Sequence, residues 1–169
     1  YIICYTVHMI GSIKGKITLK TEKFVIVETN GVGYKLSVSG ETLSKLKNKN
    51  DEVLFWTHTH VREDIFDLYG FLNREELSFF EMLISVSGIG PKGALTILGV
   101  ASIETLQKAI STSDISYLTK ISGIGKKTAE RLIIELRDKV SNKAGEKDEG
   151  SLRDELDALE ALKSLGYSQ

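Results

Sequence analysis

Two stretches of the chain carry the residue types of an anion-binding turn, and the second repeats the first. Residues 86–94 (VSGIGPKGA) return 35 positions later as residues 121–129 (ISGIGKKTA), with Gly, Ile, Gly, Lys and Ala in register. Each stretch follows an apolar run, so its glycines fall in a turn and its lysine in the first turn of the next helix. The first N–H groups of a helix lack intrahelical partners and attract a phosphate that glycine lets approach. The sequence therefore predicts two phosphate-binding turns on a duplicated helical unit.

Two known nucleotide-binding motifs resemble these turns but fit them poorly. Residues 88–93 match G-x-G-x-x-G, yet they follow a helical pattern where the dinucleotide motif needs a strand. Residues 125–128 (GKKT) lack the P-loop glycine, because Lys120 stands five positions upstream. A plain turn between packed helices is the other interpretation, and the duplication favours phosphate binding. The predicted contacts, by backbone amides with lysines adding charge, are at Gly88, Ile89, Gly90, Lys92, Gly123, Ile124, Gly125, Lys126, Lys127 and Thr128.

A second candidate site is the acidic pair Glu63 and Asp64, with Asp67 close by. Carboxylates of this kind hold metal ions in nucleases. No spacing of ligands is fixed here, so the residues alone favour a solvated turn. His58 and His60 share one face of an expected strand, but two histidines without a third ligand are more often packed or exposed than bound to zinc. No metal or cofactor is predicted.

Composition is typical of a folded protein without membrane spans. The chain has 169 residues, 41% of them hydrophobic, and no apolar run long enough to cross a bilayer. Its single cysteine, Cys4, fits a reducing cytoplasm. The formal charge of −1 divides into +1 over residues 9–70, +2 over 71–143 and −4 over 144–169. The mildly basic body allows phosphate binding by local patches but not by a strong overall field.

The elements that would position these residues begin with a β domain over residues 9–71. Five short strands are expected at residues 13–19, 24–29, 34–38, 53–61 and 65–69. Asn30-Gly31 is a hairpin turn, and Leu43 and Leu46 lie in a short helical or irregular connection. Of Phe55 and Trp56, at least one is expected in the core. The pattern predicts a small closed OB-fold barrel, with a sandwich or an SH3-like barrel as alternatives.

The second domain, residues 72–140, is expected to be all helical, with about five helices. Asn73 and Glu76 resemble a capping box, and Pro91 suits the first turn of a helix. Further boundaries are expected from single residues: Gly99 ends a helix, Ser102 caps the next, Thr112 or Ser113 caps a short one, and residues 126–140 form the last.

Both ends of the chain differ from the middle. Residues 1–8 read as a foreign or mis-called leader before Met9, without the features of a signal peptide. Residues 141–150 have no apolar anchor and are expected to be a flexible linker. Residues 151–169 carry one amphipathic helix, which cannot bury its own stripe. We expect it to be the start of a truncated C-terminal helical domain, although docking on a partner would also cover it.

Several motifs, in order along the chain, resemble the RuvA family of Holliday-junction-binding subunits of the bacterial branch-migration complex. They are Met9-Ile10-Gly11, residues 31–34 (GVGY), 57–58 (TH), 61–64 (VRED), 68–71 (LYGF), 88–92 (GIGPK) and 123–132 (GIGKKTAERL). The resemblance runs from Met9 to about Val140. Tandem helix-hairpin-helix motifs alone would be shared by many repair proteins, and the acidic turn before them makes the match specific.

The resemblance implies a DNA-binding subunit of recombination and repair that is not itself an enzyme. It implies a cytoplasmic homotetramer built by the OB-fold domain, and hairpins that grip the backbones of a four-way junction. Glu63 and Asp64 match the family's acidic pin at the junction centre. The third domain would recruit the hexameric motor ATPase RuvB, and a RuvC-type resolvase is a further partner. The competing hypotheses are a helix-hairpin-helix nuclease or glycosylase, using Lys127 or Glu63, and a scaffold that binds only proteins.

Overall fold

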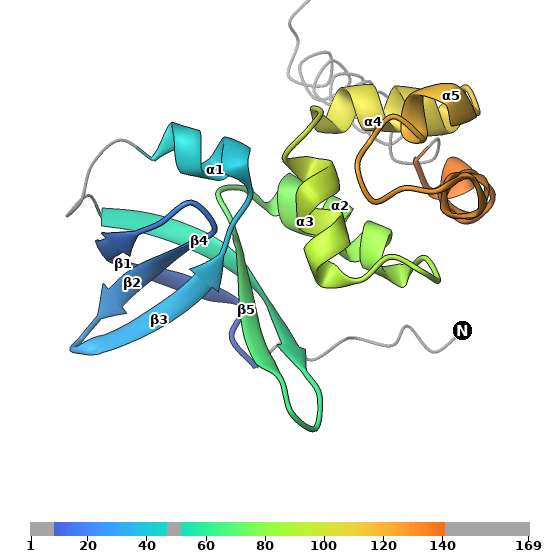
Figure 1. The fold of residues 1–169 in the computed structure, drawn as a ribbon. Helices are drawn as coiled ribbons and strands as arrows, with labels where there is room; N and C mark the ends of the chain where they lie inside the picture. The colour runs from blue at the N-terminus through green and yellow to red at the C-terminus, as the bar shows by residue number, and fades with distance from the viewer. Residues whose placement is uncertain (1–8, 47–51, 141–169) are drawn as a thin grey trace, which may run out of the picture.

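The computed structural model describes residues 9–46 and 52–140, which form a β-barrel with a group of helices beside it (Figure 1). The barrel strands are β1 (Ser12–Lys20), β2 (Phe24–Thr29), β3 (Val32–Ser37), β4 (Glu52–Val61) and β5 (Phe66–Phe71). They close in the order β1-β2-β3-β5-β4, and α1 (Gly40–Lys45) lies between β3 and β4 in the chain. The predictions for residues 1–8, 141–150 and 151–169 concern parts of the chain outside the described ranges.

The strand pattern of the sequence explains the barrel. Ile13 and Ile17 of β1 and Val25 and Val27 of β2 alternate with exposed or half-buried neighbours and are at most 4% exposed, so one face of the sheet makes the core. Asn30 and its neighbour Gly31 both have positive φ (51° and 83°), as the predicted two-residue hairpin turn requires.

One pairing decides between the alternatives for the β domain. β3 and β5 are parallel, with Leu36 opposite Leu68, whereas the other strand pairs are antiparallel. Gly70 lets β5 pass close to β3, because a Cβ there would lie 3.2 Å from the Leu36 side chain. The single closed sheet, with β5 returning between β3 and β4, confirms the predicted OB-type barrel rather than a sandwich.

The helical part follows the predicted boundaries closely. Its helices are α2 (Arg74–Ser85), α3 (Pro91–Leu98), α4 (Ile103–Ser111), α5 (Ile115–Leu118) and a helix over residues 126–140. The Asn73 side chain accepts a hydrogen bond from the Glu76 N–H at 2.7 Å. Pro91 is the first residue of α3, Gly99 is its C-cap, and Ser102 caps α4. All four predictions are confirmed.

The predicted cap of α5 is wrong. Asp114 holds that position, with its Oδ1 accepting a hydrogen bond from the Tyr117 N–H at 2.9 Å. Thr112 is instead the C-cap of α4, and Ser113 takes a left-handed conformation with φ 57°. The N–H of Asp114 bonds to the Ala109 carbonyl at 2.8 Å, so both candidate residues belong to the end of α4 and the cap falls on the next polar residue.

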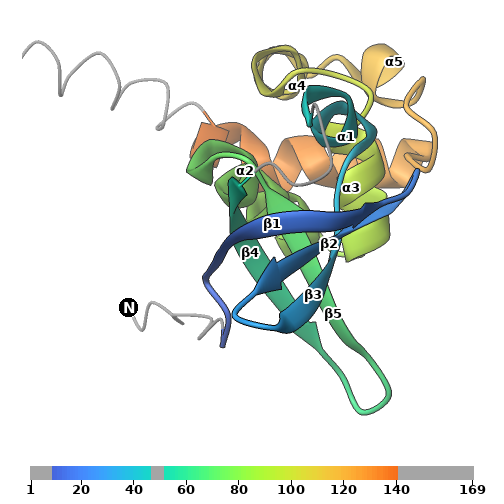
Figure 2. The same ribbon diagram turned by 90° about the vertical axis from the view of Figure 1, so that its left-hand side faces the viewer.

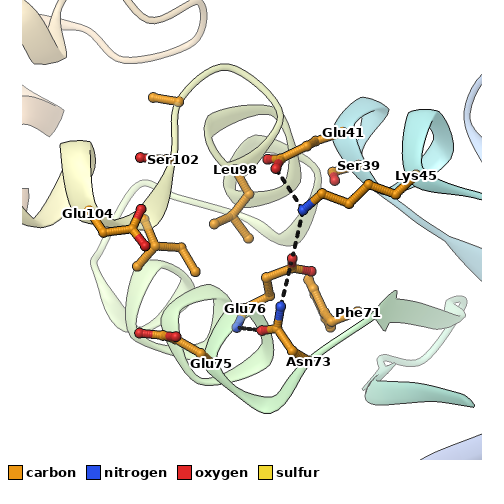
Figure 3. Close-up of a pocket in the computed structure, with 12 residues that line it drawn as sticks. Ser39, Glu41, Lys45, Phe71, Asn73, Glu75, Glu76, Leu98, Ser102 and Glu104 are labelled. Atoms are coloured by element: carbon orange, nitrogen blue, oxygen red, sulfur yellow. Dashed lines mark hydrogen bonds and ion pairs between the residues drawn. The ribbon is translucent and has the colours of Figure 1, made fainter. Parts of the chain in front are cut away.

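The barrel and the helices share packing, so their relative position is fixed by contacts. Phe80 of α2 lies against Tyr69 and Phe71 of β5, with ring centroids 5.3 and 4.8 Å apart. Lys45 of α1 lies 2.8 Å from Glu41 and 3.8 Å from Glu76 of α2 (Figure 3). Its hydrogen bond to Glu41 raises the pKa of Lys45 in spite of partial burial. The second of these ion pairs links the two domains beside the cap of α2.

No helix in the described ranges is both long and apolar enough for a membrane span.

Candidate nucleic-acid interface

The first predicted turn joins α2 to α3 and leaves helical N–H groups free for a ligand. Gly88 has φ 96°, a conformation that L side chains rarely adopt. The Ile89 N–H bonds to the Val86 carbonyl at 3.1 Å, which closes the turn. The first bond of the new helix runs from the Ala94 N–H to the Gly90 carbonyl at 2.9 Å. The N–H groups just before Ala94 therefore lie at the open end of α3, where anions bind.

The second turn has the same geometry. Gly123 has φ 89°. The Ile124 N–H bonds to the Ile121 carbonyl at 3.1 Å, and the Ala129 N–H bonds to the Gly125 carbonyl at 2.9 Å. These two distances equal those of the corresponding hydrogen bonds in the first turn, 35 residues earlier. The sequence repeat is therefore a repeated structure, and its two helix ends present backbone donors in the same way.

The predicted contact residues divide into anchors and exposed groups. Ile89 and Ile124 are 8% and 5% exposed, so their side chains hold the turns to the core and only their backbones are available to a ligand. Lys92, Lys126 and Lys127 are exposed at the two helix starts. Backbone donors and flexible cations together make a site for a phosphate chain rather than for a particular base.

Arg131 is a candidate residue that the sequence prediction missed. It lies on the helix over residues 126–140, and its Nη1 is 3.4 Å from both the backbone oxygen and the Oγ of Ser87. A Cβ at Gly88 would lie 3.9 Å from the same nitrogen. Arg131 thus spans from the second hairpin to the first turn. Its spacing of four from Lys127, which puts both on one helix face, was the signal in the sequence.

The acidic pair lies at the tip of the β4–β5 hairpin. Glu63 and Asp64 are exposed, and the hairpin projects beyond the barrel in both views (Figures 1 and 2). The turn is held by a hydrogen bond from the Arg62 N–H to the Ile65 carbonyl at 2.8 Å. Within residues 9–46 and 52–140, no three His, Cys, Asp or Glu residues are placed to hold a metal ion. The arrangement presents two carboxylates together at a projecting tip.

The two histidines pack where the barrel meets α2. His58 is 6% exposed, and its Nδ1 is 3.3 Å from the Glu81 carboxylate. The His60 ring stacks on it at 6.5 Å between centroids. Burial first, and then the nearby charges of Arg62 and His58, lower the pKa of His60.

Phe55 is fully buried, as predicted for at least one of the two aromatic residues Phe55 and Trp56. The guanidinium carbon of Arg74 lies 5.0 Å from the centroid of the neighbouring Trp56 ring.

The fold and the two turns define an OB-barrel protein with a tandem helix-hairpin-helix domain. Residues 9–70 match the family model described as RuvA N terminal domain, and residues 80–138 match that of the SAM-like helix-hairpin-helix tandem. A protein of Acetivibrio thermocellus is 43% identical over 95% of this chain and 84% of its own length. One of Caldanaerobacter subterraneus is 47% identical over 95% and 85%, and one of Clostridium botulinum is 38% identical over 93% and 83%.

All three relatives are named Holliday junction branch migration complex subunit RuvA. At these identities and coverages, the chain belongs to the RuvA family.

Proposed function

We propose that the chain binds four-way junction DNA by shape, without reading its sequence, and delivers a RuvB-type motor ATPase to the junction for branch migration. The observation that carries this is the duplicated turn, whose hydrogen bonds agree between the copies at 3.1 and 2.9 Å. Each turn offers backbone N–H groups and lysines to a phosphate, and such contacts carry no base information. The relatives' name, a subunit of the Holliday junction branch migration complex, supports the same substrate.

The proposed division of labour follows the two folded parts. Residues 9–71 would assemble the subunits into a homotetramer in the cytoplasm, and residues 72–140 would hold the DNA backbones. Residues 151–169 would belong to the part that contacts the motor, and a RuvC-type resolvase would act on the same junction. Two weak grips per subunit become a tight and selective contact only when several subunits engage one junction together.

Gel retardation tests the function directly. Two four-way junctions of unrelated sequence should be retarded at the same protein concentration, because phosphates and shape are common to both. Incubation with magnesium should leave the strands uncut. A preference for one sequence would contradict readout by shape, and cleavage would favour the nuclease hypothesis.

A first prediction concerns the acidic turn. Exchanging Glu63→Gln together with Asp64→Asn should leave junction affinity unchanged or raise it, because two negative charges near DNA phosphates are removed. Strand separation at the crossover should fall, since like-charge repulsion would no longer part the entering strands. Affinity can be measured by titration and base-pair opening by reactivity of the crossover bases.

The matched control for the acidic turn is Glu28→Gln, an exposed carboxylate on β2 of the barrel. It should change neither readout. If the double exchange abolished binding while the thermal unfolding curve stayed the same, junction binding would depend on the two negative charges, and the proposed pin role would be wrong.

A further inference from the structure

An apolar pair, Val61 and Phe66, flanks the acidic turn, and each residue is more than half exposed. Val61 ends β4 and Phe66 begins β5, and the two are directly opposite in the strand register. Their exposed fractions are 57% and 58%. The exposed Phe66 ring and the Val61 methyl groups lie at the base of the turn that carries Glu63 and Asp64.

The pair lies on the face of the hairpin that continues the barrel interior. Phe55 of β4 and Leu68 of β5 are core residues, and Val61 and Phe66 are an even number of positions away from them, so all four point to one side. The strand pairing that encloses the barrel interior stops before it reaches Val61 and Phe66. Among the described residues, β1 pairs with β4 as far as Trp56, and residues 10 and 11 extend the contact to Thr57 and Thr59 by hydrogen bonds. β3 pairs with β5 at Leu68 and Tyr69. The outer hairpin thus carries a core-type face past the strands that would cover it.

The rim of this face restricts what could bind there. Glu63 and Asp64 follow Val61 closely in the chain, and Asp67 is the neighbour of Phe66. Together with the exposed Arg62 beside Val61, these residues carry three negative charges and one positive charge, a net charge of −2 around the pair. Such a rim repels phosphates. Carboxylates accept hydrogen bonds from the amino groups of cytosine, adenine and guanine, and a phenyl ring stacks on the face of any base. Uncharged base surface fits this patch, and the DNA backbone does not.

We propose that an unpaired nucleobase at the branch point stacks on Phe66 beside Val61, with Glu63 or Asp64 accepting from its amino group. This rests on the proposed junction binding and adds a role to the same hairpin. The acidic tip keeps the phosphates away, and the apolar pair receives a base that has left its partner. Opening of the base pair at the crossover is then favoured because the freed base binds to Phe66, as well as by charge repulsion.

The test is a double-mutant cycle between protein and DNA, with the full chain. Phe66→Ala should weaken binding to an intact four-way junction by about 5- to 150-fold, the effect of losing one stacked base. On a junction whose branch-point nucleotides are abasic, the same exchange should have no effect. Phe66→Trp should retain the affinity for the intact junction, because indole also stacks. Equal losses on both junctions, no loss on either, or failure of the Trp variant would overturn the proposal.

Two controls separate this role from others. Val32 of β3 is 52% exposed, and Val32→Ala should bind both junctions as the wild type does. Sedimentation should give the same mass for Phe66→Ala and wild type. A smaller assembly would assign the pair to contact with a second copy and overturn the proposal. If the proposed function itself failed, the wild type would bind junction and duplex alike, a distinct result that would remove the basis for the role of Phe66.

Discussion

Exchange of Lys92, Lys126 and Lys127 for glutamine should lower junction affinity on the order of 100-fold at about 0.1 M salt. The three ammonium groups are exposed at the starts of α3 and of the helix over residues 126–140, beside the open backbone donors. Each lost phosphate contact should reduce the slope of log K against log salt by about 0.9, so the slope should become less steep by about 2.7 for each subunit that contacts the junction. Titrations at several salt concentrations measure both quantities.

The matched control is Lys16→Gln, which removes an exposed lysine from β1 of the barrel. Its salt dependence should equal that of the wild type. An unchanged slope in the triple variant would show that these lysines do not contact phosphates. The same loss in the control would mean that overall charge, rather than the two hairpins, drives binding.

A methyl group at the tip of each turn should also impair binding strongly. In the protein alone, a Cβ at Gly90 or Gly125 meets nothing within 4 Å. Gly90 has φ −89°, which alanine adopts readily. Gly90→Ala with Gly125→Ala should therefore fold normally, with a stability loss of about 1 kcal/mol or less per site at these helix ends. A phosphate held against the backbone would be displaced, and loss of one charge-assisted hydrogen bond per turn costs about 1.5–3 kcal/mol.

Comparison with Gly11→Ala makes this result specific. Gly11 also has free space around a Cβ, but it lies ahead of β1, outside both turns. The Gly11→Ala variant should bind junctions as the wild type does. If the double variant kept full affinity with an unchanged unfolding midpoint, the backbone would not approach the DNA closely at these turns, and the lysines alone would make the contact.

Local signals in the sequence predicted most of the fold. Alternating residues gave the barrel strands, Asn30-Gly31 gave the hairpin, and Pro91 gave the start of α3, because each acts through its own backbone or its nearest neighbours. The repeated glycines predicted both turns for the same reason. A left-handed residue and an open helix end are properties of a few consecutive residues, so an isolated motif suffices to predict them.

Contacts between distant residues were beyond such signals. The Arg131 guanidinium reaches Ser87 across 44 positions, and His58 meets Glu81 across 23. These pairs depend on how α2 packs against the barrel and against the last helix. The reach of the β4–β5 hairpin is another example, because it depends on where the neighbouring strands stop pairing. The sequence predicted an acidic turn there, but not that it projects together with Val61 and Phe66.

Two sequence-blind grips and a projecting acidic turn should together select a four-way junction over ordinary DNA. The most direct measurement is a competition titration at one salt concentration, in which a labelled junction is displaced by unlabelled junction or by linear duplex of the same sequences. Unlabelled junction should displace the label at concentrations where the duplex has no effect. Equal displacement by junction and duplex would contradict it.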